Sequence, residues 1–169
     1  MPLSMYQASV PVFLRGFANL SAILTKAEAY AEAKKIDPAV LTGARLFPDM
    51  FPLTKQVQIA TDVVKGGMAR LAGVEIPSFP DTEVTFAELQ ARIEKCVAFL
   101  KTIKPEQVDG TEEKKVTLKV GGNEMTFAGQ PYLLSFIIPN FYFHSAVTYS
   151  ILRHNGLDVG KMDFLGKPE

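Results

Sequence analysis

His144 is the residue of this chain whose type and position most directly suggest chemistry. Placed on a helix that turns about 100° per residue, it lies near the centre of an apolar stripe, and Asn140 and Thr148 lie one turn before and one turn after it. An imidazole can bind a metal, take up a proton or hold a ligand. Together the three side chains form a polar column inside a helical bundle, where such folds commonly build ligand and metal sites.

Two further polar residues belong to the candidate set. Gln56 lies at the edge of the apolar stripe of the second expected helix and is the expected partner of His144, and Asp49, just before that helix, can reach a cavity mouth. The alternative interpretation of His144 is a core histidine with one nitrogen bonded to a neighbouring Thr, Asn or backbone carbonyl. His154, in the last turn of its helix, is interpreted as a capping or surface residue that the helix dipole favours.

Four segments with apolar residues at helical spacing provide the elements that must position these side chains. They predict helices over residues 6–35, 52–73, 85–104 and 131–155. The third begins with a capping box formed by Thr85 and Glu88. Alternating residues on either side of Gly121-Gly122 predict a β-hairpin, which must pack against the bundle because an isolated hairpin is marginally stable.

The proline-containing linker over residues 74–84 bears on how the helices are arranged. Fully extended, such a linker reaches roughly 40 Å, whereas a helix of about 20 residues is roughly 30 Å long. The linker can therefore run the length of the bundle, and the second and third helices are predicted to be parallel. Within the second helix, Gly66-Gly67 predicts the close approach of another backbone.

The composition limits the class of protein. With 169 residues, of which 47% are hydrophobic and 21% charged, the chain predicts one globular domain over residues 1–169. Eighteen basic residues balance 18 acidic ones, so the basic surface that nucleic-acid binding requires is missing. No apolar run is long enough to span a membrane and no signal peptide is evident, so a cytoplasmic protein is expected.

The single cysteine, Cys96, excludes an internal disulfide and a multi-cysteine metal site. It lies on the apolar stripe of the third predicted helix and is interpreted as a small buried hydrophobe. The chain also lacks a glycine-rich phosphate loop, a GxSxG elbow and an HExxH zinc motif.

The segments PNFYFHSAVTYSILRHNGLDVGKMDFLG (residues 139–166) and ARLFPDMFPLTKQVQIA (residues 44–60) carry a family resemblance. The chain resembles a bacterial family of unknown function within the DinB/YfiT-like superfamily, over nearly its whole length. The resemblance implies an all-α fold with a small β-hairpin, namely a DinB-like up-down-down-up four-helix bundle. DinB-like proteins are often dimers, so a homodimer is expected, with Tyr142 and Tyr149 suited to its interface.

Better known members of the superfamily bind a divalent metal through three histidines, one on helix two and an HxxxH pair on helix four. Some are thiol-dependent transferases or isomerases. His144 resembles the first histidine of that pair, but Thr148 stands at the second position and helix two contains no histidine. The resemblance therefore implies the fold without the full metal site, and His144 is the one candidate metal ligand.

Three functional hypotheses follow. The leading one is a small-molecule-binding protein with no assigned cofactor, whose polar-lined pocket is formed by His144, Thr148, Asn140, Gln56 and Asp49. The second is an enzyme dependent on a metal or a thiol cofactor, such as a transferase or isomerase. In it, His144 is the ligand or general base, helped by Gln56, Asp49 or His154. The third is a structural or interaction protein whose pocket is collapsed.

Overall fold

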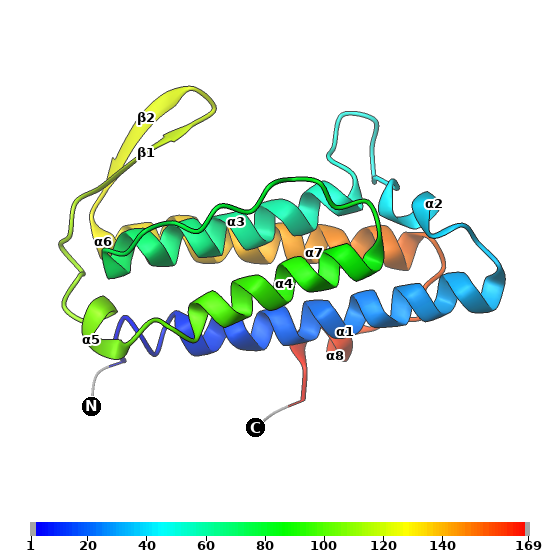
Figure 1. The fold of residues 1–169 in the computed structure, drawn as a ribbon, viewed down its shortest axis with the longest axis horizontal. Coiled ribbons are helices and arrows are strands. Elements are labelled where there is room, and N and C mark those ends of the chain that lie inside the picture. The colour runs from blue at the N-terminus through cyan, green and yellow to red at the C-terminus, as the bar shows by residue number, and fades with distance from the viewer. Residues whose placement is uncertain (1–2, 168–169) are drawn as a thin grey trace.

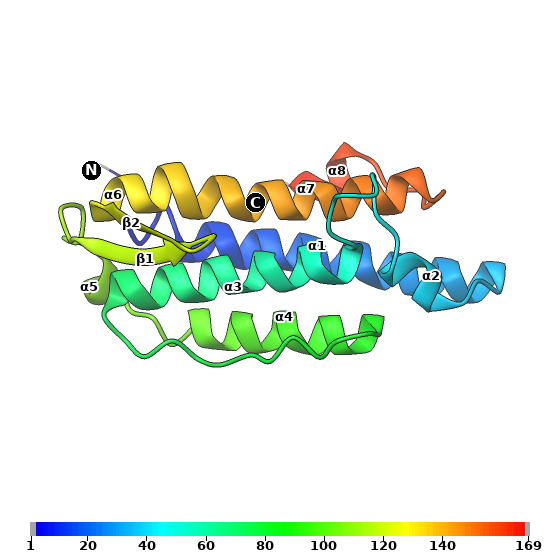
Figure 2. The same ribbon diagram turned by 90° about the horizontal axis from the view of Figure 1, so that it is seen from above.

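Four long helices packed side by side form the body of the protein in the computed structural model, which describes residues 3–167. They are α1 (Val10–Lys34), α3 (Leu53–Ala72), α4 (Phe86–Leu100) and α7 (Ile138–His154). Helices α1 and α7 run in one direction and α3 and α4 in the other (Figures 1 and 2). This is the up-down-down-up bundle that the sequence predicts.

Shorter elements join the long helices. They are α2 (Pro38–Thr42), α5 (Pro105–Val108), the strands β1 (Val116–Val120) and β2 (Asn123–Phe127), α6 (Gly129–Pro131), the π-helical turn η1 (Tyr132–Ile137) and α8 (Lys161–Leu165). The first long helix begins at Val10 and not at Tyr6, with Pro11 in its first turn, where a missing N–H costs nothing. Pro52 precedes α3 as its N-cap and is not its first residue. Neither α2 nor α5 was predicted.

The last helix is continuous from Gly129 to His154 but is wound more widely over η1. Pro139, just beyond η1, explains the wider turn. In a regular α-helix its ring would clash with the carbonyl of Ser135, four residues earlier, and it has no N–H to donate. The π-helical turn is therefore a local adjustment that lets the chain carry a proline within a long buried helix.

The linker between α3 and α4 runs along the outside of these two helices from one end of the bundle to the other (Figure 1). It returns the chain to the starting end of α3, so α4 runs parallel to α3 as predicted. The predicted capping box is present. Thr85 Oγ1 accepts from the Glu88 amide at 3.2 Å, and the Glu88 carboxylate accepts from the Thr85 amide at 2.9 Å.

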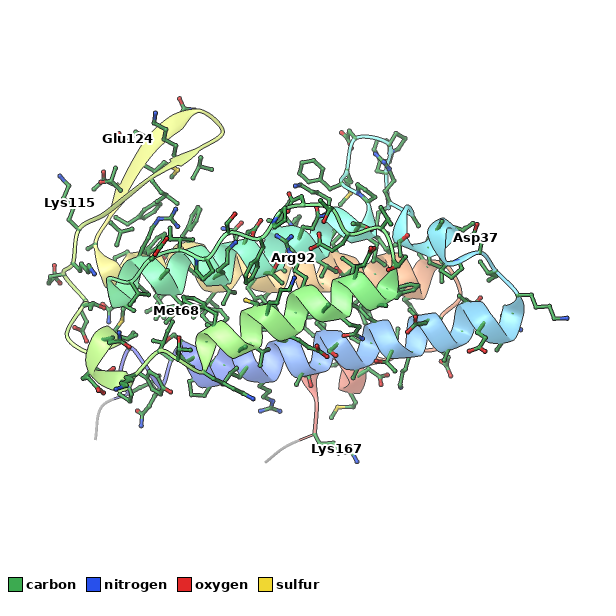
Figure 3. All side chains as sticks on the ribbon, viewed as in Figure 1. Asp37, Met68, Arg92, Lys115, Glu124 and Lys167 are labelled. Atoms are coloured by element: carbon green, nitrogen blue, oxygen red, sulfur yellow. The ribbon has the colours of Figure 1, made fainter. Side chains whose placement is uncertain are left out.

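Arg92 of α4 fastens this linker to the bundle (Figure 3). Its side chain is 1% exposed, and its Nη1 donates to Glu83 Oε1 at 3.0 Å. Its Nη2 lies 3.0 Å from Asp81 Oδ1 and donates to Asp62 Oδ1 on α3 at 2.8 Å. The Nε donates to Thr61 Oγ1 at 2.7 Å. One buried guanidinium thus joins α3, α4 and the linker.

Around Arg92 the charges are balanced by further cations. Lys65 Nζ lies 2.9 Å from Asp62 Oδ1 and 4.2 Å from the centre of the Phe79 ring. Burial alone would raise the pKa of Asp81, but the hydrogen bond and positive charge of Lys55, together with Arg92, hold it below its ordinary value. Asp81 therefore stays ionised at neutral pH.

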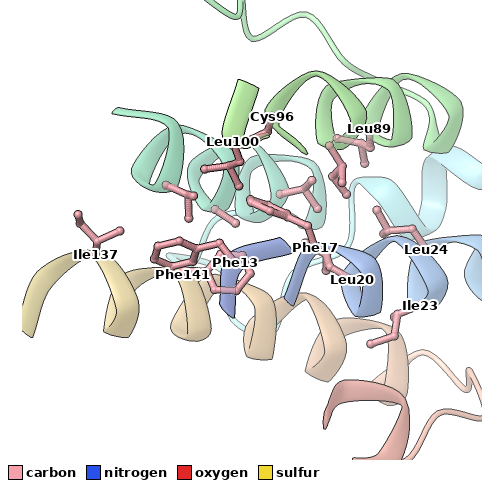
Figure 4. Packing of buried hydrophobic residues seen from close by; sticks show 14 of the residues in the cluster. Phe13, Phe17, Leu20, Ile23, Leu24, Leu89, Cys96, Leu100, Ile137 and Phe141 are labelled. Atoms are coloured by element: carbon pink, nitrogen blue, oxygen red, sulfur yellow. The ribbon is translucent and has the colours of Figure 1, made fainter. Parts of the chain in front are cut away.

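The core lies between the four long helices and contains several aromatic rings (Figure 4). The rings of Phe13 and Phe17 on α1 meet that of Phe141 on α7 edge to face, with centroids 5.5 and 4.9 Å apart. Gly16 lies against the same ring, and a Cβ atom there would be 2.6 Å from Phe141 Cζ. The glycine therefore lets α1 approach α7 closely.

Gly67 of α3 has a comparable role. A Cβ atom at this position would overlap the side chain of Ile137 on η1. The close neighbour is thus a side chain and not a backbone, which corrects the prediction for Gly66-Gly67. At Gly66 a Cβ atom would meet Arg70 Nη1 at 2.8 Å, the far end of a flexible side chain.

Cys96 is fully buried on α4, as its place on the apolar stripe predicts, and its Sγ donates weakly to the carbonyl oxygen of Thr61 at 3.6 Å. Burial raises the pKa of its thiol to about 12. We expect a thiol-reactive dye such as DTNB to leave Cys96 unmodified in the native protein and to modify it rapidly in urea, because the reactive species is the thiolate. Rapid native labelling would contradict this placement.

The β-hairpin packs against the bundle through Val116, Leu118 and Phe127. Val116 is buried, and the ring of Phe127 lies tilted against those of Tyr132 and Phe136 of η1, with ring centroids 5.6 and 5.3 Å apart. Towards the turn, Val120 and Met125 are 38% and 39% exposed. The tip of the hairpin projects beyond the helices (Figure 1), so the prediction that the hairpin packs against the bundle holds for Val116, Leu118 and Phe127 and not for the residues near the turn.

The C-terminal segment that ends in α8 folds back on the bundle. Asn19 on α1 donates to the carbonyl oxygen of Phe164 at 3.1 Å, and Lys26 pairs with Asp163. The ring of Phe164 contacts those of Tyr142 and Tyr149, with centroids 6.4 and 6.0 Å apart. The chain's own tail therefore covers part of the aromatic surface predicted to suit a partner subunit.

Candidate functional site

The structure brings His144 of α7 and Gln56 of α3 into direct contact. The imidazole Nδ1 lies 2.7 Å from the side-chain oxygen Oε1 of Gln56, and the two residues are 8% and 2% exposed. Helices α3 and α7 pack against each other along their length (Figure 2). Both residues reach the interface because each lies on or beside the apolar stripe of its helix.

The backbone of Phe51 determines the orientation of the Gln56 amide. Gln56 Nε2 donates to the Phe51 carbonyl oxygen at 3.0 Å, which leaves Oε1 directed at the imidazole. A carbonyl oxygen can only accept, so Nδ1 of His144 must carry the proton. The neutral imidazole therefore has its lone pair on Nε2.

Nε2 of His144 is the reactive atom of the pair. It has no hydrogen-bond partner among residues 3–167. This nitrogen is also not fully buried, so it keeps some contact with solvent. Burial lowers the pKa of His144 below its ordinary value, because an uncompensated charge is costly there. The pair thus presents a neutral acceptor at neutral pH.

Asn140 and Thr148 lie one turn either side of His144, as predicted, but their side chains bond their own helix. Asn140 Nδ2 donates to the Phe136 carbonyl oxygen at 2.8 Å, and Thr148 Oγ1 donates to the His144 carbonyl oxygen at 2.9 Å. Both are bonds to the carbonyl four residues earlier, which polar side chains within helices commonly form. Neither side chain is hydrogen-bonded to the imidazole.

Asp49 and His154 are not brought into the pair. Asp49 is exposed in the turn that precedes α3, and His154 is exposed at the end of α7. The exposed position of His154 agrees with its interpretation as a surface or capping residue. Of the predicted set, the structure joins His144 to Gln56 and places Asn140 and Thr148 on either side of them.

The geometry does not fit a divalent metal bound through His144. Residues 3–167 contain no group of three or more His, Cys, Asp or Glu side chains that could hold one. Gln56 Oε1 accepts from Nδ1 instead of converging with it on a shared point, and the Thr148 hydroxyl donates to a backbone carbonyl. Neutral amide and hydroxyl groups are also poor substitutes for imidazole at a transition metal.

Two aromatic residues beside the pair were not anticipated. The ring of Phe143 meets that of His144 edge to face at 5.1 Å and is 56% exposed as a residue. Phe51, whose carbonyl holds Gln56, is 53% exposed. Phe143 departs from the expected pattern of apolar residues on the inner face of its helix, and that departure was the available signal in the sequence; Phe51 precedes α3 and has no such pattern to break.

Comparison with known proteins places this chain in a family. The model of a domain of unknown function, DUF1993, matches residues 5–165, which is nearly the whole chain. The chain belongs to the DUF1993 family. A crystal structure of a DinB family member protein from Shewanella denitrificans is similar to it, with 39% sequence identity and a TM-score of 0.87. The match covers 96% of this chain and 92% of that one.

These similarities confirm the predicted resemblance and the DinB-like bundle of this DUF1993 protein. No curated protein matches it. Among the described residues, no helix combines the length and the apolar character that crossing a membrane requires.

Proposed function

We propose that this DUF1993 protein binds a small molecule at the His144–Gln56 pair. The observation that carries the proposal is the difference between the two imidazole nitrogens. Nδ1 is hydrogen-bonded to Gln56 Oε1 at 2.7 Å, while Nε2 has no partner among residues 3–167. An oriented neutral acceptor at the edge of a core suits a ligand that donates a hydrogen bond through an O–H or N–H group.

The surroundings of the pair support an apolar ligand body. The ring of Phe143, a residue that is 56% exposed, lies against that of His144, and Phe51, whose backbone carbonyl accepts from Gln56, is 53% exposed. Ligand sites typically combine aromatic walls with a few oriented polar groups. The ligand class we propose is therefore an aromatic or aliphatic molecule that carries one hydrogen-bond donor.

Phenol is a suitable probe because it combines a ring with a single O–H donor. We expect titration with phenol to shift the ¹⁵N resonance of His144 Nε2, since that atom would accept the new hydrogen bond. Binding should be lost in a His144→Gln variant and kept in the matched His154→Gln variant, whose histidine is exposed. The outcome that contradicts the proposal is an unchanged Nε2 resonance at saturating phenol.

The metal-dependent alternative is tested by adding Zn²⁺ to protein purified without an affinity tag. If the enzyme hypothesis were correct, Zn²⁺ would bind stoichiometrically to the wild type, and this binding would be lost in His144→Gln. The donor set of the pair argues against this result, because Gln56 Oε1 is occupied by Nδ1. If neither phenol nor Zn²⁺ binds, the structural role of His144 is the correct one.

The lowered pKa of His144 predicts a specific pH dependence of stability. In the unfolded chain the His144 imidazole has a pKa of about 6.5. In the folded protein burial lowers that pKa. As the pH falls below about 6.5, the unfolded state binds the proton first, so stability declines until the folded pKa is passed. Above about pH 6.5 His144 is neutral in both states, and this pH-dependent loss of stability is absent.

Urea denaturation at pH 7 and pH 5 tests this dependence. We expect the wild-type protein to lose more stability between the two pH values than the His144→Gln variant, which lacks the titrating group. The His154→Gln variant should follow the wild type. Equal losses in wild type and His144→Gln would show that the imidazole is not buried in its neutral form.

A further inference from the structure

Ser145 of α7 has an unsatisfied hydroxyl. The residue is 4% exposed, and its Oγ is the one fully buried side-chain nitrogen or oxygen atom of residues 3–167 that has no hydrogen-bond partner. A serine within a helix usually bonds the carbonyl four residues earlier, as Thr148 does on the same helix. A buried hydroxyl without a partner is costly, so a group from outside the chain is expected to supply one.

Ser145 is one of the residues that line a small cavity between α1, α7 and the C-terminal segment. Leu20, Ile23 and Phe141 form apolar walls, Asn19 is a second polar neighbour, and Phe164 of α8 closes the outer side. The cavity volume of about 10 Å³ is room for one water-sized group. Charged side chains are absent from its lining in the described chain, so the group that enters must be neutral.

A wider cleft of about 350 Å³ adjoins this cavity. The two spaces share four lining residues, Gly16, Asn19, Tyr142 and Phe164. Arg15 lines the cleft, where its Nη2 donates to the carbonyl oxygens of Leu165 and Lys167 at 3.1 and 3.0 Å. The cleft is therefore large enough for the body of a small organic molecule, while the cavity admits only its tip.

We propose that this is a binding site for a small neutral molecule with an apolar body and one terminal hydroxyl or carbonyl oxygen. The body occupies the cleft between Tyr142 and Phe164, and the oxygen enters the cavity and bonds Ser145 Oγ. The serine hydroxyl can donate to a carbonyl and both donate to and accept from a hydroxyl. The site lies between α1 and α7, separate from the His144–Gln56 pair between α3 and α7.

Benzyl alcohol and toluene are matched probes for this site, because they differ by the hydroxyl group. In NMR titrations of the full chain we expect benzyl alcohol to shift the amide resonances of Gly16 and Ser145. Its affinity should fall about 5- to 10-fold in Ser145→Ala, the loss expected for one hydrogen bond. Toluene should bind wild type and Ser145→Ala equally, which also shows that the variant is folded.

Two control variants make the result specific. Ser150→Ala removes a hydroxyl from the same helix outside the cavity lining, and His144→Gln removes the imidazole of the other proposed site, which benzyl alcohol can also occupy. In both variants the affinity read from the Gly16 amide, which lines the cavity, should equal that of the wild type. Equal affinity of benzyl alcohol for wild type and Ser145→Ala would overturn the proposal. So would a crystal soaked in benzyl alcohol that shows only a water molecule on Ser145 Oγ.

Discussion

Replacing Arg92 with methionine is expected to lower the free energy of unfolding by about 3 kcal/mol, because removal of one member of a buried ionic cluster leaves the others without partners. Glu83 is the group most affected, since its side chain is 11% exposed. Asp62 and Asp81 are 40% and 36% exposed and can regain water, which keeps the loss near the lower end of the range for buried pairs.

The matched substitution Arg153→Met provides the control. Arg153 also pairs with an aspartate, Asp158, at 3.1 Å, but the two side chains are 55% and 104% exposed. A pair of this kind contributes at most about 1 kcal/mol. Urea denaturation of both variants should therefore separate them clearly.

Limited proteolysis provides a second measurement of the Arg92 cluster. Because Arg92 joins the linker over residues 74–84 to α3 and α4, its loss should make this linker the first site of cleavage. An Arg92→Met variant as stable as Arg153→Met, with an unchanged cleavage pattern, would show that the cluster does not fasten the linker.

The arrangement of the helices could be predicted because its determinants are local in the sequence. The reach of the linker allowed α3 and α4 to be parallel, and Thr85 and Glu88 marked the start of α4 through a bond between residues three positions apart. Turn glycines between alternating residues similarly identified the hairpin. Such signals involve neighbours along the chain, so no knowledge of the packed structure is required to interpret them.

The Arg92 cluster could not be predicted because its members come from three segments. Asp62 lies on α3, Arg92 lies on α4, and Asp81 and Glu83 lie on the linker. Each has the appearance of a solvent-exposed charge when only its own segment is considered. Only the path of the linker over the bundle brings the carboxylates to one guanidinium and excludes water from it.

The candidate site was predictable in part for the same reason. Helical position alone placed His144 and Gln56 on facing stripes, and the structure brings them into contact. Helical position also placed Asn140 and Thr148 beside the imidazole, but it could not show that their side chains bond their own backbone. The unsatisfied hydroxyl of Ser145 depends on the fold of the C-terminal segment and leaves no trace in residue spacing.

Replacing either of the two adjacent glycines of α3 by alanine should change the free energy of unfolding, in opposite directions at the two positions. Alanine is favoured over glycine within a helix by about 1 kcal/mol. At Gly66 the new Cβ atom meets only the movable end of Arg70, so Gly66→Ala should be neutral or stabilising. At Gly67 it overlaps the buried side chain of Ile137, and overpacking of a core costs about 1–3 kcal/mol.

Thermal and urea denaturation of Gly66→Ala and Gly67→Ala measure this difference directly. The double variant Gly67→Ala with Ile137→Val tests its cause, because the smaller side chain makes room for the new methyl group. We expect it to recover part of the loss, as coupled neighbours do. If Gly67→Ala were as stable as Gly66→Ala, the close packing of α3 against η1 would not hold. The contact of Gly67 with Ile137 lies on the same α3 surface that presents Gln56 to His144. Because Gly67→Ala disturbs the packing of that surface, it should also weaken the binding of phenol.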